Sequence, residues 1–405
     1  MSQLIVQKYG GTSVGNIERI KNVANRIKSY VDEGNKLVVV VSAMGDTTDN
    51  LIQLAQAIST NPPKRELDML LATGEQQSIA LLSMALYELG VKAISLTGPQ
   101  AGMKATGSYG KARIEEIDTR RIYKELEKYD VVVVAGFQGI SDDEDIVTLG
   151  RGGSDLSAVA LAAALRADIC EIYTDVDGVF TTDPRIVPEA KKIDVISYDE
   201  MLELASLGAG VMQSRSIEVA KKYNVIIHVR NSMNNNPGTV IKEEDENMES
   251  VLVRGIARDL SEAKVTIRAV PDKPGIAAKI FERLAEGNIN VDVIIQNVSL
   301  EGKTDISFTV KKTDLNDAKQ LLESLRNELE FGDIITEEDI AKVSIVGVGM
   351  RSHSGVAYKM FKVLADLGIN IEMISTSEIK ISVVIKANKS DEAVRALHKA
   401  FELDK

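Results

Sequence analysis

The stretch VQKYGGTSVG at residues 6–15 decides how the first half of this chain is interpreted. It starts as an apolar strand, carries Lys8 toward the pair Gly10 and Gly11, and leads into a helical pattern near Asn16. Glycine lets the backbone approach an anion closely, a helix start offers free N–H groups, and lysine adds a positive charge. The stretch therefore predicts a phosphate-binding loop, although a glycine pair after a strand is also common in ordinary turns.

Several other nucleotide and catalytic motifs are absent from the sequence. There is no Gly-x-x-x-x-Gly-Lys-Ser/Thr loop, which sets the P-loop ATPases aside, and no Gly-x-Gly-x-x-Gly dinucleotide loop. Cys-x-x-Cys is also missing, and none of the histidines His228, His353 and His398 has a metal-ligand spacing. Zinc and dehydrogenase functions therefore have weak support.

Short Val- and Ile-rich runs alternate with helical patterns up to about residue 240. We expect strands at residues 37–41, 91–95, 131–135, 169–174 and 225–229. Nearly continuous apolar strands separated by helices are typical of a largely parallel sheet covered on both faces, so the sequence predicts an α/β domain. The Asn-rich stretch at residues 231–238 then interrupts this pattern, and the charged run at 242–247 indicates a boundary.

Composition narrows the class of protein. The chain has 405 residues with 60 acidic and 48 basic side chains, a net charge of -12, and no basic stripe, so nucleic acid is an unexpected partner. The single cysteine, Cys170, cannot form an intrachain disulfide, which fits a reducing compartment. Apolar runs such as 158–165 are far shorter than the ~20 residues that span a bilayer. We therefore expect a cytoplasmic protein that contacts neither membrane nor nucleic acid.

Beyond the boundary the chain repeats itself. Residues 263–270 match residues 341–348 at an offset of 78, and residues 274–294 match residues 354–374 at an offset of 80. Each copy reads as strand, loop, helix, strand, strand, helix, which predicts two small α+β units that cover each other's open sheet edges or faces. Chance similarity of two amphipathic helices would not easily place a glycine and an Ile-Asn pair at one offset.

Another Gly-rich cluster, GRGGSD at residues 150–155, stands at the start of a helix expected over 156–166. Arg151 suits a carboxylate and Asp155 suits an ammonium group, so the cluster could hold a zwitterionic small molecule. The alternative is an ordinary N-cap in which Ser154 or Asp155 satisfies the helix N–H groups.

Two more clusters contain acidic residues. Gly74 interrupts a helical pattern over 65–89. A break in the helix there would aim Glu75 at a cleft. The alternative is an exposed glutamate beside a glycine that the helix tolerates. The segment TDVDGVFTTDPR at residues 174–185 follows the expected strand 169–173. Its polar groups would lie at the carboxyl end of a parallel strand, where open α/β sheets bind ligands, although Asp-Gly and Asp-Pro also form turns.

These clusters together carry a resemblance to a known family. The segments QKYGGTSVG, VVVVSAMG, TGEQ, GFQG, LGRGGSD, YTDVDGVFTTDPR and VRNSMNNNPGT occur in this order. The ordered set closely resembles the aspartate kinases of the amino-acid kinase family, and the C-terminal repeat resembles the paired ACT domains that regulate them. The resemblance covers essentially all of the chain. It implies a catalytic domain at residues 1–242 and ACT (ferredoxin-like) domains at 263–335 and 341–405.

The resemblance implies transfer of the γ-phosphate of ATP, accompanied by Mg²⁺, to the side-chain carboxylate of L-aspartate. The product would be 4-phospho-L-aspartate, at the head of lysine, threonine and methionine synthesis. A carboxylate with a pKa near ~3.9 is already ionised at neutral pH, so no general base is required. The sequence identifies no metal ligands.

Site residues follow from the matching motifs. Lys8 and the amides of Gly10 and Gly11 would hold the transferring phosphoryl group, and Arg151 would bind the α-carboxylate of aspartate. The residues implied around aspartate are Ser42, Thr47, Glu75, Arg151, Gly153 and Asp155. Those implied around the nucleotide are Thr174, Asp175, Phe180, Asp183 and Arg185.

Three positions depart from the family pattern. Phe180 stands where some relatives have tyrosine, and Ser354 replaces the proline expected in the second ACT loop. Gly210 stands where others have a phosphate-binding lysine, for which Arg215 or Lys221 could substitute.

The ACT units imply an amino-acid effector, with lysine, threonine or both as candidates. A carboxylate would lie at a helix start and an ammonium beside Asp272. The residues implied for these sites between the copies are Asp272, Gly275, Ala277, Gln296, Asn370, Ile371 and Thr376. ACT edges also favour a homodimer or higher oligomer, and Met248 could start a shorter regulatory chain, as in some relatives.

Two other functions remain open from the sequence. A different carboxylate or carbamate kinase, such as an N-acetylglutamate kinase, would keep the phosphate loop but would not need Glu75 and Asp155 near a free ammonium. A non-catalytic amino-acid sensor would keep the repeats and lose the loop. Intact Lys8, Gly10 and Gly11 argue against the sensor.

Overall fold

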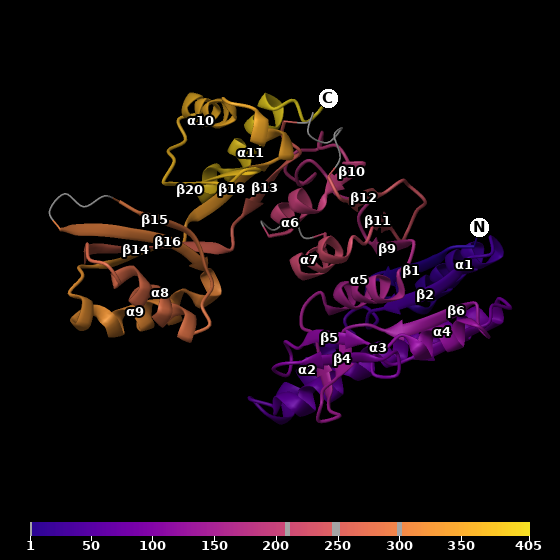
Figure 1. The fold of residues 1–405 in the computed structure, drawn as a ribbon. Helices are drawn as coiled ribbons and strands as arrows, with labels where there is room; N and C mark the ends of the chain where they lie inside the picture. The colour runs from indigo at the N-terminus through magenta and orange to yellow at the C-terminus, as the bar shows by residue number, and fades with distance from the viewer. Residues whose placement is uncertain (1, 207–210, 245–251, 298–301) are drawn as a thin grey trace. The chain divides into compact units, whose positions relative to one another are not determined.

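The computed structural model describes residues 2–206, 211–244, 252–297 and 302–405 (Figure 1). The chain forms two compact units. The first holds the N-terminal part as far as residue 245, apart from the segment 180–191, and the second holds that segment together with the C-terminal part.

An eight-stranded sheet forms the centre of the first unit, in the order β10-β12-β11-β9-β1-β2-β6-β3. All neighbouring strands are parallel except the antiparallel pair β11 and β12. The strands are β1 (Leu4–Tyr9), β2 (Lys36–Val41), β3 (Ala93–Leu96), β6 (Val131–Ala135), β9 (Ile169–Thr174), β10 (Val195–Ser197), β11 (Ile227–Asn231) and β12 (Thr239–Lys242). The predicted α/β class is confirmed, and each predicted strand occurs within two residues of its expected start.

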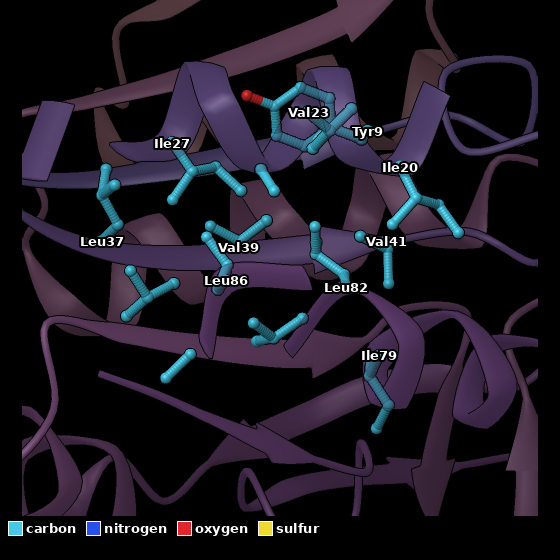
Figure 2. Close-up of a cluster of buried hydrophobic side chains, with 14 of the residues drawn as sticks. Tyr9, Ile20, Val23, Ile27, Leu37, Val39, Val41, Ile79, Leu82 and Leu86 are labelled. Carbon is cyan, nitrogen blue, oxygen red and sulfur yellow. The ribbon is translucent and has the colours of Figure 1, made fainter. Parts of the chain in front are cut away.

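Helices cover both faces of this sheet. They are α1 (Ile17–Asp32), α2 (Thr47–Ile58), α3 (Lys64–Glu88), α4 (Arg120–Leu126), α5 (Gly153–Leu165), α6 (Tyr198–Ser206) and α7 (Ser214–Tyr223). Figure 2 shows side chains of α1 and α3 meeting Leu37, Val39 and Val41 of β2, which alternate along the strand and therefore share one face. Helix α5 packs on β1, β2 and β9 and is buried almost all round, which explains its uniformly apolar sequence.

A second, four-stranded sheet in this unit was not predicted. Its order is β5-β4-β7-β8. The strands are β4 (Met103–Thr106), β5 (Arg113–Ile117), β7 (Gln138–Ile140) and β8 (Ile146–Thr148). The Asn-rich stretch at residues 231–238, which interrupts the predicted pattern, connects β11 to β12 inside the eight-stranded sheet.

The second unit contains the two repeats, each with a four-stranded antiparallel sheet. The first repeat comprises β14 (Glu262–Pro271), α8 (Ile276–Glu286), β15 (Val291–Gln296), β16 (Lys303–Lys311), η1 (Lys312–Asp314), α9 (Leu315–Leu329) and β17 (Ile334–Glu337). The second comprises β18 (Ile340–Val346), η2 (Val348–Ser352), α10 (Val356–Asp366), β19 (Met373–Thr376), β20 (Lys380–Lys386), η3 (Ala387–Lys389) and α11 (Ser390–Ala400). The predicted element order of the repeat is thus present in both copies.

The two copies obtain their fourth strand differently. In the first sheet, β17 pairs with β14 and follows the repeat in sequence. In the second sheet, the equivalent place beside β18 is taken by β13 (Gly255–Asp259), which precedes the first repeat. The first copy is therefore an insertion between the strands of the second sheet.

Candidate active site

The predicted phosphate loop follows β1, which lies between β2 and β9 in the sheet. A side chain at Gly11 would place its Cβ 2.9 Å from the carbonyl oxygen of Ala43, so only glycine fits there. The Gly10 amide was expected to bind phosphate. It donates instead to the Tyr173 carbonyl at 3.3 Å and is therefore not free. The start of α1 is also partly occupied, because the Asn16 side chain accepts from the Arg19 amide at 2.9 Å. The amides of Gly11 and Thr12 have no acceptor among the described residues, which leaves them as the loop's available donors.

Lys8 and Asp155 form an ion pair beside this loop. The Lys8 Nζ lies 2.8 Å from the Asp155 Oδ1, and their side chains are 12% and 11% exposed. Charges so poorly hydrated are stabilised chiefly by each other. The pair joins the carboxyl end of β1 to the first turn of α5, so residues 147 positions apart in the chain meet at one point.

The start of α5 has an unusual glycine-rich turn. Gly150 and Gly152 have φ of 77° and 69°, which favour glycine, and Gly152 is the N-cap residue without a side-chain capping bond. The alternative expectation of a cap by Ser154 or Asp155 was wrong, because both lie within the helix, which begins at Gly153. Uncapped N–H groups and the helix dipole make this turn suitable for an anion.

Arg151 projects from the same turn. It is exposed and has no ion pair or hydrogen bond within the described part of the chain. Its guanidinium is therefore available to a carboxylate, as the sequence predicted.

Glu75 is buried in α3, with 3% of its surface exposed. Its Oε1 accepts from the Ala43 amide at 3.1 Å, whereas its Oε2 has no hydrogen-bond partner in the described part of the chain. Burial raises the pKa of Glu75 to about 7. An unpaired, buried carboxylate oxygen is costly and is suited to receive a cationic group.

The expected helix break at Gly74 was wrong. Helix α3 is continuous through it, and a Cβ there would lie 2.8 Å from the Ala43 Cβ, so glycine allows α3 to pack closely on the loop after β2. That loop carries Ser42, whose amide donates to the Tyr9 carbonyl at 3.1 Å. Thr47 begins α2 and donates through its hydroxyl to the Met44 carbonyl at 2.6 Å. The structure thus brings Glu75 next to the loop that contains Ser42 and Thr47.

The residues implied for the nucleotide fall into two groups. Thr174 ends β9 and, with the exposed Asp175, belongs to the first unit. Phe180, Asp183 and Arg185 lie in the segment 180–191, which packs within the second unit. There, Arg185 and Asp183 form an ion pair at 2.7 Å, and this partner lowers the pKa of Asp183.

The two proposed substitutes for the missing lysine have other partners. Arg215 donates to the carbonyls of Leu149 and Ala112 at 2.9 and 3.2 Å, and Lys221 binds Asp199 at 2.6 Å. Arg215 thus supports the turn before α5 rather than offering its charge to a phosphate. Gly210 itself, and Met248, lie outside the described residues.

A buried polar cluster behind the phosphate loop was missed by the sequence reasoning. Glu171 of β9 accepts from Gln7 at 2.8 Å, from Tyr30 at 2.9 Å and from Arg230 at 3.2 Å. It joins β1, α1, β9 and β11. A glutamate in the middle of an apolar strand was the available signal, since buried carboxylates need partners.

The implied effector residues lie on exposed parts of the repeats. Gly275 has φ of 92° and is the N-cap of α8, with no side-chain cap, so Asp272 does not cap this helix. Asp272 is exposed and its side chain has no partner within the described ranges. Ala277 lies in the first turn of α8, Gln296 ends β15, Asn370 and Ile371 precede β19, and Thr376 ends β19.

Among the described residues, no group of three or more histidine, cysteine or acidic side chains is placed to hold a metal ion. No described helix combines the length and the apolar character needed for a bilayer span. The longest of them, α3, has 25 residues.

Comparison with known proteins relates these features to a family. The model of the amino acid kinase family matches residues 3–231, and that of the ACT domain matches residues 264–325 and 343–401. An aspartokinase from Mycolicibacterium smegmatis is 53% identical over 405 residues, covering 99% of this chain and 96% of the relative. An aspartate kinase from Pseudomonas putida is 54% identical over 402 residues, covering 99% and 98%.

Solved structures agree in fold. The structure of E. coli aspartokinase III in complex with aspartate and ADP has a TM-score of 0.82 at 26% identity and covers 98% of this chain and 99% of its own. The same enzyme in complex with lysine and aspartate has a TM-score of 0.78 at 27% identity, covering 99% and 100%. The chain therefore belongs to the aspartate kinases, which are ATP-dependent kinases with an amino acid kinase domain followed by ACT domains.

Proposed function

We propose that this protein transfers the γ-phosphate of ATP to the β-carboxylate of L-aspartate, giving ADP and 4-phospho-L-aspartate. This reaction would supply lysine, threonine and methionine synthesis in the cytoplasm. The buried Lys8–Asp155 pair, set between the phosphate loop and the uncapped start of α5, carries the proposal. The E. coli relative in complex with aspartate and ADP supports the same substrate and nucleotide.

The chemistry needs positioning more than proton transfer. An oxygen of the aspartate β-carboxylate forms a bond to the γ-phosphorus while the bond to the β-phosphate oxygen breaks, and ADP leaves. The attacking carboxylate is already ionised near neutral pH, so no general base is needed. The protein must bring two anions together and stabilise the charge that spreads over the phosphoryl oxygens.

Lys8 would supply that charge at the carboxyl end of β1, together with the Gly11 amide. Asp155 holds the Lys8 ammonium in place through their 2.8 Å contact. Mg²⁺ would neutralise phosphate charge when bound.

Aspartate would be held at its two charged ends. Arg151, which has no partner among the described residues, would bind the α-carboxylate. The buried Glu75 would meet the ammonium through its Oε2, which is unpaired within the same residues. Binding a cation there offsets the cost of burying the carboxylate. Thr174 and Asp175 of the first unit, and Phe180, Asp183 and Arg185 of the second, remain the proposed nucleotide residues.

Regulation would reside in residues 263–405. We expect lysine, threonine or both to inhibit, and the E. coli relative in complex with lysine supports an amino-acid effector. We also expect at least a homodimer through this part, because β15 and β19 are edge strands in their sheets. Light scattering at micromolar concentration, with and without both amino acids, checks this, and a monomer under all conditions would contradict it.

A coupled ADP-release assay tests the proposed reaction. It compares aspartate, N-acetylglutamate and no acceptor, with hydroxylamine trapping of an acyl phosphate as a second readout. We expect ADP release and trapped product with aspartate alone. Release with N-acetylglutamate instead would indicate the other carboxylate kinase, and no acceptor-dependent release would favour an amino-acid sensor.

A further inference from the structure

Asp177 lies in the loop after β9, three residues beyond the end of that strand. Its Oδ1 accepts hydrogen bonds from the side-chain amides of Asn231 at 2.6 Å and Asn234 at 2.9 Å. Its Oδ2 accepts from the amide of Asn236 at 3.2 Å. One carboxylate therefore gathers the side chains of the Asn-rich connection between β11 and β12.

The same connection contacts the phosphate loop. The Ser232 amide donates to the Thr174 carbonyl at 2.8 Å, and the Ser13 hydroxyl donates to the Ser232 hydroxyl at 2.8 Å. Arg26 of α1 donates to the carbonyls of Ser232 and Asn234 at 3.3 and 2.7 Å. The Asn-rich connection thus bridges Ser13 of the phosphate loop and Thr174 at the end of β9.

The far end of the Asp177 loop is fixed as well. Gly178 has φ of 141°, and a Cβ there would lie 2.5 Å from the Thr239 hydroxyl oxygen. That hydroxyl accepts from the Val179 amide at 2.9 Å and donates to the Ile193 carbonyl at 2.6 Å. Between these attachments, and among the described residues, the carboxylate of Asp177 is the side-chain link between the two loops. Its loss would loosen the segment that carries Thr174 and Asp175, which would keep the backbone bond between the Ser232 amide and the Thr174 carbonyl.

We propose that Asp177 is a positioning residue for the nucleotide: through Asn231, Asn234 and Asn236 it holds Thr174 and Asp175 at a set distance from the phosphate loop. The inference rests on the proposed ATP-dependent function. The three amides also hold the pKa of Asp177 below its ordinary value, with Asn234 as the leading cause, so the carboxylate stays ionised and accepts from all three at neutral pH.

The test uses the full chain and ADP alone, so that binding is measured without turnover. Asp177→Ala is compared with wild type by calorimetric titration of ADP, and then by KM values for ATP and for aspartate. We expect ADP affinity to fall about tenfold and the KM for ATP to rise similarly, because three hydrogen bonds to a charged group are lost together and the loop can partly recover. The KM for aspartate should change less than about twofold.

Asp32→Ala is the matched control, since it removes an exposed acid of the same unit that pairs with Lys28 only. It should leave both KM values unchanged. Asn234→Ala and Asn236→Ala give a graded series, and the loss of the 2.9 Å contact should weaken ADP binding more than the loss of the 3.2 Å contact.

If Asp177→Ala does not fold, the single variants Asp177→Asn and Asn234→Ala are measured instead. Both keep the length of the loop, and each weakens the contact between Asp177 and the Asn-rich connection. ADP affinity within twofold of wild type in folded variants would overturn the proposal, as would an equal loss of ADP and aspartate affinity. A wild-type protein that binds ADP without phosphorylating aspartate would refute the proposed function and still leave this test valid.

Discussion

The proposed catalytic residues of the first unit and the proposed effector residues of the repeats differ in how far the chain buries them. Asp155 and Glu75 are buried, the Lys8 side chain is 12% exposed, and each of the three contacts another part of the first unit. Asp272, Gln296 and Asn370 are exposed at strand ends and loops of the second unit. Buried charges are held in one geometry before a ligand arrives, whereas exposed groups lose freedom only on binding. We therefore expect changes in the first unit to affect rate steeply and changes in the repeats to affect inhibition moderately.

Lys8→Ala should give the largest effect. It removes the cation beside the transferring phosphoryl group and leaves Asp155 unpaired, so kcat should fall ~100-fold or more. Steady-state kinetics measures this, with thermal unfolding to confirm folding. Lys28→Ala, which removes only an exposed ion pair with Asp32, is the control. A folded Lys8→Ala enzyme with nearly normal kcat would remove Lys8 from the site.

Arg151→Ala should act on aspartate. A charge-assisted guanidinium–carboxylate contact contributes about 1.5–3 kcal/mol, so the KM for aspartate should rise at least tenfold while that for ATP changes little. The exposed Arg120, paired with Asp118, supplies a control variant of the same kind. A collapse of ATP affinity instead would place Arg151 at the nucleotide.

Glu75 should give the aspartate reaction a pH dependence. With its pKa near 7, the carboxylate is about one-tenth ionised at pH 6 and about nine-tenths at pH 8, so kcat/KM for aspartate should rise roughly tenfold over this range. Glu75→Gln should lower kcat/KM and flatten the profile. A profile unchanged by this substitution would show that another group titrates.

The stability of the free protein should also depend on the ionisation of Glu75. It should fall as pH rises, whereas kcat/KM for aspartate rises. The folded pKa of Glu75 lies above the unfolded value of 4.5, so the stabilisation is complete below the unfolded pKa and is lost as pH rises through about 7. A shift of this size corresponds to about 3 kcal/mol. Urea unfolding of wild type should therefore give lower stability at pH 8 than at pH 6, and Glu75→Gln should reduce the difference.

Asp272→Ala should have the smallest effect on the enzyme itself. The uninhibited rate should be unchanged, while inhibition constants for lysine, threonine or their mixture should rise about five- to tenfold, within the usual range of allosteric coupling. Asp317→Ala changes another exposed acid of the first repeat and is the control. Unchanged inhibition in a folded Asp272 variant would remove this residue from the effector site.

Local patterns predicted much of the molecule. The strand at residues 131–135 coincides with β6, because its continuous valine run buries both faces. The strand at residues 169–174 coincides with β9, most of whose side chains are also buried. The sequence also predicted the phosphate loop, the turn before α5 and the repeat offset, because each of these depends on residues near one another in sequence. The small sheet of the first unit was missed, because strands such as β5 are short and mostly exposed.

Features that depend on distant pairing were decided only by the tertiary structure. Nothing local in residues 255–259 shows that β13 completes the sheet of the second repeat, because its partner β18 begins more than 80 residues later. The segment 180–191 is continuous with the nucleotide motif yet packs in the second unit, where Thr181 contacts His398 at 2.9 Å. From the sequence, the Asn-rich stretch is only an interruption of the strand and helix pattern. In the structure, the side-chain amides of Asn231, Asn234 and Asn236 all contact Asp177.

The sequence by itself determined the chemistry available to this protein: a lysine and glycines after a strand, an arginine and an acid at a helix start, and a duplicated α+β unit. The tertiary structure decided which of these groups meet. Lys8 and Asp155, like Glu75 and the Ala43 amide, are brought together by parallel strands and the helices that cross between them. Residue type and local pattern are read along the chain, whereas burial and pairing depend on contacts between segments that sequence order does not specify.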